Sequence, residues 1–208
     1  MKAGIITIPE REESLNRLLD IIIPEVPDVY IFTDYEHKGP WWNEWRMFVD
    51  MLTNAEKGEP VLLMTDDAIT ISGFRKLWED IHYVEQSSLY TLFSRQRNLF
   101  TEENVARGYV TKVQPRGFYD IAAIYIDQQD LPRKVLSWLF DSDIDSLPPR
   151  VRKLRSQGRH IDVVIQDYFV YHDIPWTITT PTLFDHQATK STLGHNVGGS
   201  PRYIGDTV

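Results

Sequence analysis

The chain has 208 residues, 42% of them hydrophobic, so it is long enough to bury a full core as one domain. It contains no cysteine, which excludes disulfides and thiolate metal sites and favours a reducing compartment. The formal net charge of −8 argues against a surface that binds nucleic acid mainly through its charge.

Segments of strand and helix character alternate along the chain, which predicts an α/β fold. In chain order we expect a strand at 3–8, a helix at 15–24, a strand at 29–33, a helix at 41–54, a strand at 60–65, a helix at 73–84, strands at 89–93 and 109–113 separated by a charged loop, a strand at 117–126, a helix at 131–140, a helix at 161–171, a strand at 176–179 and irregular structure from 181. No linker is evident, so we expect a single domain over 1–208, with 194–208 as a loop or mobile tail.

The apolar runs are too short to span a bilayer, and no signal peptide is recognisable. We therefore expect a soluble, cytoplasmic protein with no membrane partner.

The run from 60 to 65 has no polar face, as in a strand buried on both sides, and it ends in Asp66 and Asp67. Open α/β sheets place their ligands at the carboxyl ends of strands. Two adjacent carboxylates repel each other, so a positive partner is expected, and a divalent cation is the first candidate. The alternative is an Asp that merely caps the next helix.

The helix at 161–171 carries Asp162 and Asp167, which lie five residues apart and face different ways. Asp162 falls in the first turn, where a carboxylate suits the helix dipole. Asp167 lies deeper in an apolar helix, so it must be paired, solvated in a cleft or protonated. Whichever of them borders an active-site cleft is a candidate general base.

The run Pro-Thr-Leu-Phe-Asp-His-Gln-Ala-Thr-Lys-Ser-Thr-Leu-Gly-His at 181–195 gathers two His, one Lys and several hydroxyls. Neutral His is a good metal ligand, and Lys190 with the hydroxyl of Ser191 suits diphosphate oxygens.

These features together resemble a family. Thr-Ile-Pro-Glu-Arg after the first strand, the acidic pair, the late-helix Asp and the terminal run are similar to GT-A glycosyltransferases, in particular small enzymes with a terminal Pro-Ser-Leu-Phe-Gln-His signature. These include branching N-acetylglucosaminyltransferases and related viral or bacterial proteins. The resemblance implies a GT-A, Rossmann-like mixed sheet flanked by helices, which binds a nucleotide-sugar donor such as a UDP-sugar together with a divalent cation, manganese or else magnesium.

The resemblance also implies a role for each matching residue. Asp67 and His186 would hold the metal or diphosphate, and Asp167, or failing that Asp162, would be the base that deprotonates the acceptor. The donor would be bound by Thr7, Pro9, Arg11, Asp34, Asp66, Lys190 and Ser191. One departure is that Thr65 stands where the usual motif has an acidic residue, which predicts a weaker or altered metal site.

Several readings stay open. A base implies an inverting reaction, although a retaining one needs none. One acceptor is a hydroxymethylated base in viral DNA, which the basic stretch at 150–160 favours and which would place the protein in the host cytoplasm. A saccharide or a lipid-linked glycan is the other. A nucleotidyltransferase shares the sheet and the acidic pair, but it would normally carry a Gly-rich loop after the first strand. A non-catalytic binding protein on the same fold is the third class.

Overall fold

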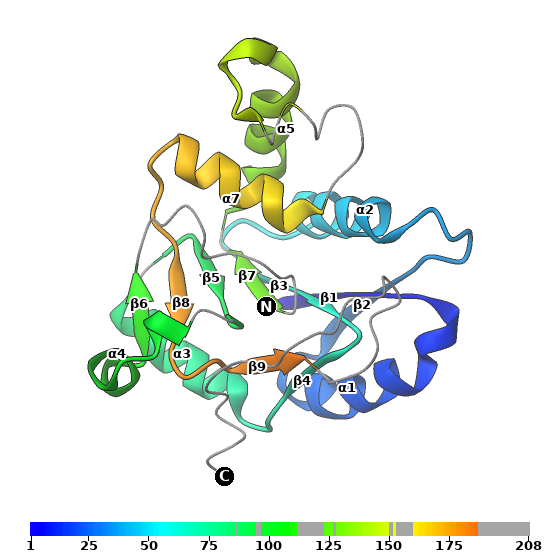
Figure 1. Ribbon diagram of the computed structural model, residues 1–208. Helices are drawn as coiled ribbons and strands as arrows, with labels where there is room; N and C mark the ends of the chain where they lie inside the picture. Colours follow the sequence, from blue (N-terminus) through cyan, green and yellow to red (C-terminus); the bar gives the residue numbers. More distant parts are fainter. Residues whose placement is uncertain are drawn as a thin grey trace.

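The computed structural model describes residues 1–85, 87–94, 97–111, 123–126, 128–149, 152 and 160–186. It shows a mixed sheet with helices on both faces (Figure 1), which confirms the predicted α/β class. The elements are β1 (Lys2–Thr7), η1 (Pro9–Arg11), α1 (Glu12–Glu25), β2 (Asp28–Thr33), α2 (Pro40–Thr53), β3 (Val61–Thr65), β4 (Ala68–Thr70), α3 (Phe74–Val84), β5 (Leu89–Thr91), η2 (Arg97–Leu99), α4 (Glu102–Arg107), β6 (Tyr109–Thr111), β7 (Ala123–Ile126), α5 (Leu131–Asp141), η3 (Ile144–Ser146), α7 (Ile161–Tyr171), β8 (Thr177–Thr179) and β9 (Phe184–His186).

The larger sheet has seven strands in the order β2-β1-β3-β7-β5-β8-β6. Strand β1 pairs in parallel with both β2 and β3, so that Ile5 lies between Ile31 and Met64. Strand β7 runs antiparallel to β3 and β5, while β8 is parallel to β5 and antiparallel to β6. The parallel trio β2-β1-β3 is Rossmann-like, and the carboxyl ends of its strands share one edge of the sheet.

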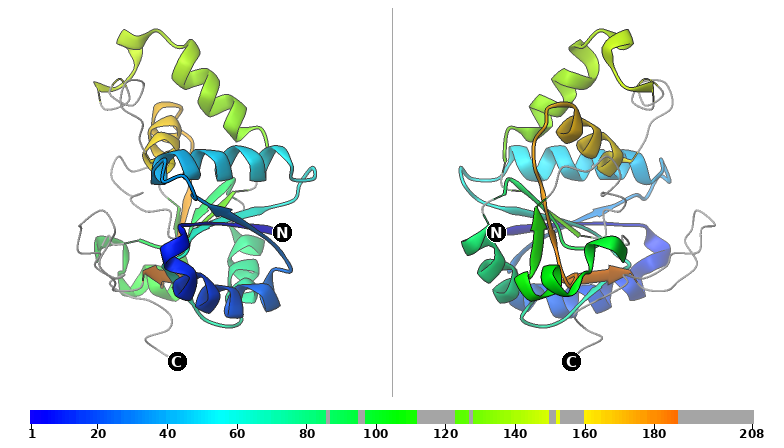
Figure 2. Two further views of the ribbon diagram at one scale, coloured as in Figure 1. Left: turned by 90° about the vertical axis from the view of Figure 1, so that its right-hand side faces the viewer. Right: turned by 60° about the vertical axis from the view of Figure 1, so that its left-hand side comes forward.

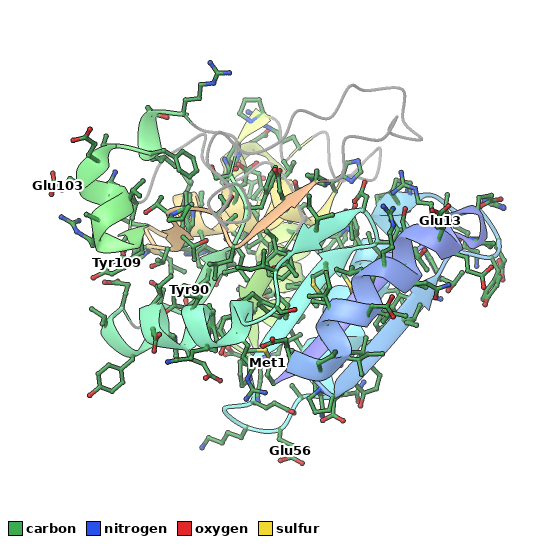
Figure 3. The ribbon with its side chains drawn as sticks, turned by 90° about the horizontal axis from the view of Figure 1, so that it is seen from below. Met1, Glu13, Glu56, Tyr90, Glu103 and Tyr109 are labelled. Carbon is green, nitrogen blue, oxygen red and sulfur yellow. The ribbon has the colours of Figure 1, made fainter. Side chains whose placement is uncertain are left out.

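Helices α2, α5 and α7 lie on one face of this sheet, and α1 and α3 lie on the other (Figures 1 and 2). Seen from below, α1 and α3 stand in front of the strands (Figure 3). Each face has its own core, one including Met47, Leu63 and Val164 and the other including Leu18 and Trp78. Val61–Thr65 therefore lies between two apolar layers, as its continuous hydrophobic run predicts.

Helix α2 approaches β1 closely because β1 carries Gly4. A Cβ atom at that position would lie 2.9 Å from Cγ of Met51 and 3.0 Å from Cγ of Met47. Distances this short require neighbouring atoms to move, so the missing side chain is what lets the helix pack so near the strand. The close fit helps set the height of α2 above the sheet.

Two segments differ from the sequence-based expectation. Residues 102–107 form helix α4 rather than loop: the Thr101 hydroxyl accepts the N–H of Asn104 at 3.2 Å, and Gly108, at φ 88°, ends the helix. Residues 184–186 form β9 rather than irregular chain. Phe184 packs edge-on against Phe74 at 5.0 Å, and the segment pairs antiparallel with β4.

Other expectations agree or fall outside the described residues. Helix α1 ends at Glu25, one residue beyond the expected stop at Pro24. Of the strand expected at 117–126, only 123–126 is described, and the tail expected at 194–208 lies outside the described residues. Among the helices that the structure describes, none has the length and apolar character needed to cross a membrane.

Candidate functional site

The candidate site lies at the carboxyl edge of the parallel trio. Strands β1, β2 and β3 end at Thr7, Thr33 and Thr65. Backbone hydrogen bonds extend the strand pairing beyond these ends: Asp34 N–H donates to the carbonyl of Thr7 at 3.0 Å, and Asp66 N–H donates to that of Ile6 at 3.1 Å. Asp34 and Asp66 therefore stand on either side of the end of β1.

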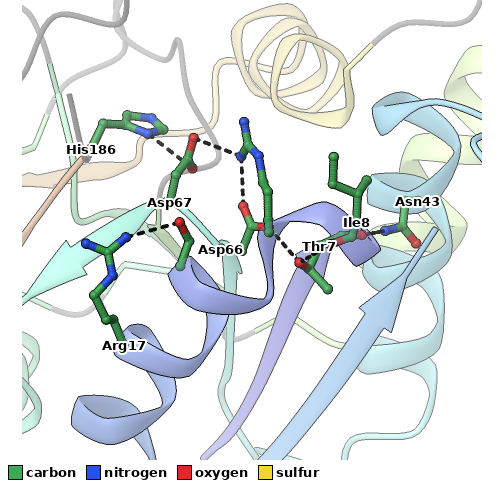
Figure 4. Close-up of polar contacts among 9 residues, drawn as sticks. Thr7, Ile8, Arg17, Asn43, Asp66, Asp67 and His186 are labelled. Carbon is green, nitrogen blue, oxygen red and sulfur yellow. Dashed lines mark hydrogen bonds and ion pairs between the residues drawn. The ribbon is translucent and has the colours of Figure 1, made fainter. Parts of the chain in front are cut away.

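The acidic pair is held by residues from the first strand and loop (Figure 4). The Thr7 hydroxyl donates to Oδ2 of Asp66 at 2.6 Å. The Arg11 guanidinium donates from Nη1 to Oδ1 of Asp66 at 2.8 Å and to Oδ2 of Asp67 at 3.2 Å. Arg11 is therefore a positive partner that balances the two carboxylates, a role for which the sequence suggested a cation.

His186 reaches the same place from the far end of the described chain. In the β4–β9 ribbon it lies directly opposite Ala68, the residue after Asp67. Its Nδ1 lies 3.4 Å from Oδ1 of Asp67 (Figure 4), and its ring stands edge-on to Phe93 with the centroids 4.8 Å apart. The structure thus brings together the two residues that the resemblance implies as metal ligands.

The two carboxylates have different acidities. Burial raises the pKa of Asp66, and the opposing effects of Thr7 and Arg11 do not cancel the rise. Burial also raises the pKa of Asp67, but the hydrogen bond and charge of His186, the Thr65 hydroxyl and Arg11 outweigh it and hold the pKa well below its ordinary range. Asp67 is therefore the more acidic of the pair.

Asp34 lies at this edge but is engaged with its own loop. Its two carboxylate oxygens accept the backbone N–H groups of Lys38 at 3.0 Å and Gly39 at 2.9 Å. It is buried, so in this structure it organises the turn between β2 and α2. Pro9 starts η1 and is exposed, and the turn it begins carries Arg11 to the acidic pair.

Asn43 and Glu44 connect this edge to α7, and the sequence analysis did not identify either of them. The Asn43 side-chain amide donates to the carbonyl oxygen of Phe32 at 2.6 Å. Glu44, 4% exposed, accepts the N–H of Ile161 at 3.0 Å and lies 2.7 Å from Nδ1 of His160. The first turn of α7 is therefore held beside the first turn of α2. The available signal was a polar Asn-Glu pair inside a Trp-rich helical stripe.

This arrangement separates the two candidate bases. Asp162 lies in the first turn of α7, next to the contact with Glu44, and its Oδ1 accepts the N–H of Val163 at 2.7 Å. Asp167 is 2% exposed and lies about 7.5 Å further along the helix axis. Asp162 therefore lies in the turn of α7 that Glu44 holds against α2.

The donor atoms at this edge fit a divalent cation in part. Asp67 and His186 offer a carboxylate oxygen and an imidazole nitrogen, which suit manganese. Cations that accompany nucleotides commonly take one or two protein ligands and obtain the rest from phosphates and water. Within the described part of the chain, no three His, Cys, Asp or Glu side chains are grouped to hold an ion. Lys190 and Ser191 lie outside the described residues.

Comparison with known proteins gives structural likenesses only. No protein family and no curated protein matches the chain. A Bacillus anthracis protein described as a glucose-1-phosphate thymidylyltransferase, in complex with sucrose, matches with 15% identity and a TM-score of 0.41 over 88% of this chain and 69% of its own. The galactosyltransferase LgtC, with donor and acceptor sugar analogues, matches with 9% identity and a TM-score of 0.38 over 81% of this chain and 69% of its own. At these values neither likeness assigns a family or an activity to this chain.

Proposed function

We propose that this chain is a GT-A-type glycosyltransferase that moves a sugar from a nucleotide-sugar donor, a UDP-sugar, to a hydroxyl acceptor. The observation that carries the proposal is the meeting of Arg11, Asp67 and His186 at the carboxyl edge of a parallel sheet. They come from the first loop, the end of a buried strand and the terminal signature. Three separate motifs that converge on one ligand-binding edge favour an enzyme over an inert fold.

On the donor side, Asp67 and His186 would hold a manganese or magnesium ion. When bound, such an ion supplies positive charge to the diphosphate leaving group. Arg11 adds a guanidinium, whose planar donors suit phosphate oxygens, and Thr7 keeps Asp66 oriented beneath it. Lys190 and Ser191, which lie outside the described residues, would contribute further phosphate contacts.

On the acceptor side, a carboxylate of α7 would take the proton of the attacking hydroxyl, which makes the reaction inverting. We favour Asp162, because Glu44 holds its turn against α2 next to Asn43, which bonds to the carbonyl oxygen of Phe32 in β2, and we keep Asp167 as the alternative. The base works best when partly desolvated, and both side chains are buried.

The proposal leaves two classes of acceptor. A hydroxymethylated base in viral DNA is one candidate and a saccharide is the other. Of the basic stretch at 150–160 that favours DNA, the structure describes Arg152 and His160. His160 faces Glu44, so that position favours helix anchoring over phosphate binding.

The proposal is tested by a thermal-shift screen of nucleoside diphosphates and nucleotide-sugars, each with and without manganese. A ligand that binds only the folded state raises the melting temperature by mass action. We expect a manganese-dependent shift with one uridine nucleotide, and its loss in Asp67→Ala. If Asp67→Ala keeps the full shift, the cation assignment is wrong.

The products separate the competing enzyme classes. A glycosyltransferase releases a nucleoside diphosphate from the donor, whereas a nucleotidyltransferase releases pyrophosphate from a nucleoside triphosphate. Release of pyrophosphate would replace our proposal with the second class. Absence of a shift with every nucleotide would favour a binding protein on this fold.

A further inference from the structure

Three of the four oxygens of the acidic pair accept hydrogen bonds, and the fourth, Oδ1 of Asp67, lies beside the ring of His186. Asp66 receives the Thr7 hydroxyl on Oδ2 and Nη1 of Arg11 on Oδ1. Asp67 receives the same nitrogen on Oδ2 at 3.2 Å and faces Nδ1 of His186 from Oδ1 at 3.4 Å. A cation that binds Asp67 therefore meets the positive charge of Arg11 on the same carboxylate, and the two like charges repel each other.

Of the two side chains that lie against the oxygens of Asp67, Arg11 can move away more easily. Its bond to Asp67 is longer than its bond to Asp66, 3.2 Å against 2.8 Å. It stands at the end of η1, a short turn with no buried residues, so its side chain can move without disturbing the core. His186, in contrast, is 5% exposed and fixed in a strand against Phe93.

We infer that Arg11 is a displaceable counterion: it neutralises the acidic pair while the site is empty, and it gives up Asp67 when a divalent cation binds. The inference rests on the proposed function, since it takes the cation and the diphosphate from there. A guanidinium released beside a bound cation is well placed to bind the diphosphate, for which it is a bidentate partner. Cation and diphosphate then favour each other's binding through the same side chain, and by linkage the effect is reciprocal.

Binding of manganese alone tests whether Arg11 competes with the cation for Asp67. Free manganese is measured by electron paramagnetic resonance in titrations of the full-length wild type, Arg11→Gln and Arg17→Gln. Arg17 is the matched control: it lies on α1, exposed, and bonds to Glu13 and Ser14 of its own helix, so its removal changes the net charge equally. We expect Arg11→Gln to bind manganese about tenfold more tightly than wild type, and Arg17→Gln to stay within about twofold.

Binding of uridine diphosphate tests whether Arg11 links cation binding to diphosphate binding. Its affinity is measured with and without manganese by calorimetry. In wild type, manganese should tighten diphosphate binding and diphosphate should tighten manganese binding by the same factor. In Arg11→Gln this mutual factor should be smaller than in wild type, because only the direct bonds between the cation and the diphosphate then link the two ligands. Arg11→Lys keeps the charge and serves if Arg11→Gln does not fold; it should tighten manganese binding less than tenfold but measurably.

Manganese affinity that is equal or weaker in Arg11→Gln overturns the inference, as does an unchanged mutual factor. No manganese binding in any of the proteins overturns the cation assignment with it. If manganese binds and responds to Arg11→Gln but no nucleotide binds, the proposed function fails while the displacement of Arg11 stands.

Discussion

Asp67 and His186 meet because Asp67 directly precedes β4, the strand with which His186 pairs. His186 pairs across the ribbon with Ala68, so the carboxylate one residue earlier falls beside its ring, 3.4 Å from Nδ1. The ribbon is secured by the Thr70 hydroxyl, which donates to the carbonyl of Leu183 at 2.7 Å. An acid at the end of a central strand and a histidine near the end of the described chain are thus joined by backbone pairing rather than by a loop.

The low pKa of Asp67 predicts how stability depends on pH. Because the pKa is lower in the folded state than its unperturbed value of 3.8, the carboxylate stabilises the fold above that value and stops doing so as pH falls through the folded pKa. We expect the difference in unfolding free energy between wild type and Asp67→Asn to shrink as the pH falls below about 4, where the carboxylate takes up a proton in the unfolded chain before it does so in the folded one. Urea unfolding at each pH measures it. The exposed Asp80→Asn is the control, and curves for Asp67→Asn and wild type that stay parallel into acid would contradict the prediction.

Replacing Thr7 should destabilise the fold through Asp66. Thr7→Val removes the hydroxyl that donates to Oδ2 at 2.6 Å and leaves a buried carboxylate oxygen without that bond. We expect a loss of about 1–3 kcal/mol in unfolding free energy, measured by urea unfolding. Thr33→Val is the matched control, since Thr33 lies opposite Thr7 in the sheet and should lose less than about 0.5 kcal/mol. An equal loss in both variants would show that the hydroxyl bond to Asp66 is not the cause.

Glu44 should hold the first turn of α7. Glu44→Ala removes the acceptor of the Ile161 N–H and the partner of His160, so we expect a loss of about 1–3 kcal/mol together with faster hydrogen exchange at residues 161–163. His160→Gln keeps the capping carboxylate and should leave that exchange close to wild type. Exchange that rises only globally in Glu44→Ala would mean that the carboxylate stabilises the fold without anchoring the helix end.

The two α7 carboxylates should separate binding from transfer. Asp162→Asn should keep manganese-dependent donor binding and lose transfer by a factor of about 10²–10⁴, the usual contribution of a general base. Asp167→Asn should keep both if Asp162 is the base. Transfer and donor binding are measured on the same preparations, with hydrolysis of the donor as the reaction until an acceptor is found. Loss of transfer only in Asp167→Asn would assign the base to Asp167 instead.

Local pattern alone determined much of the architecture. The apolar run at 61–64, which Thr65 ends, predicts a strand with helices on both faces, and that is where β3 lies. Helical spacing likewise placed the helices that pack on the sheet. These elements are recognisable because burial on a defined face imposes a period that neighbouring residues display by themselves.

Only the tertiary structure decided what surrounds the acidic pair. The sequence called for a positive partner, but the choice of Arg11 depends on the turn of η1 bringing its guanidinium back over β3. The strand at 184–186 escaped prediction because three residues carry no period, and its stability comes from pairing with β4. No local pattern distinguishes Glu44 from the other polar residues of its helix, and only the packing of α7 against α2 supplies its partner, the N–H of Ile161. Contacts between residues far apart in the chain leave no local pattern, and the candidate site is made of such contacts.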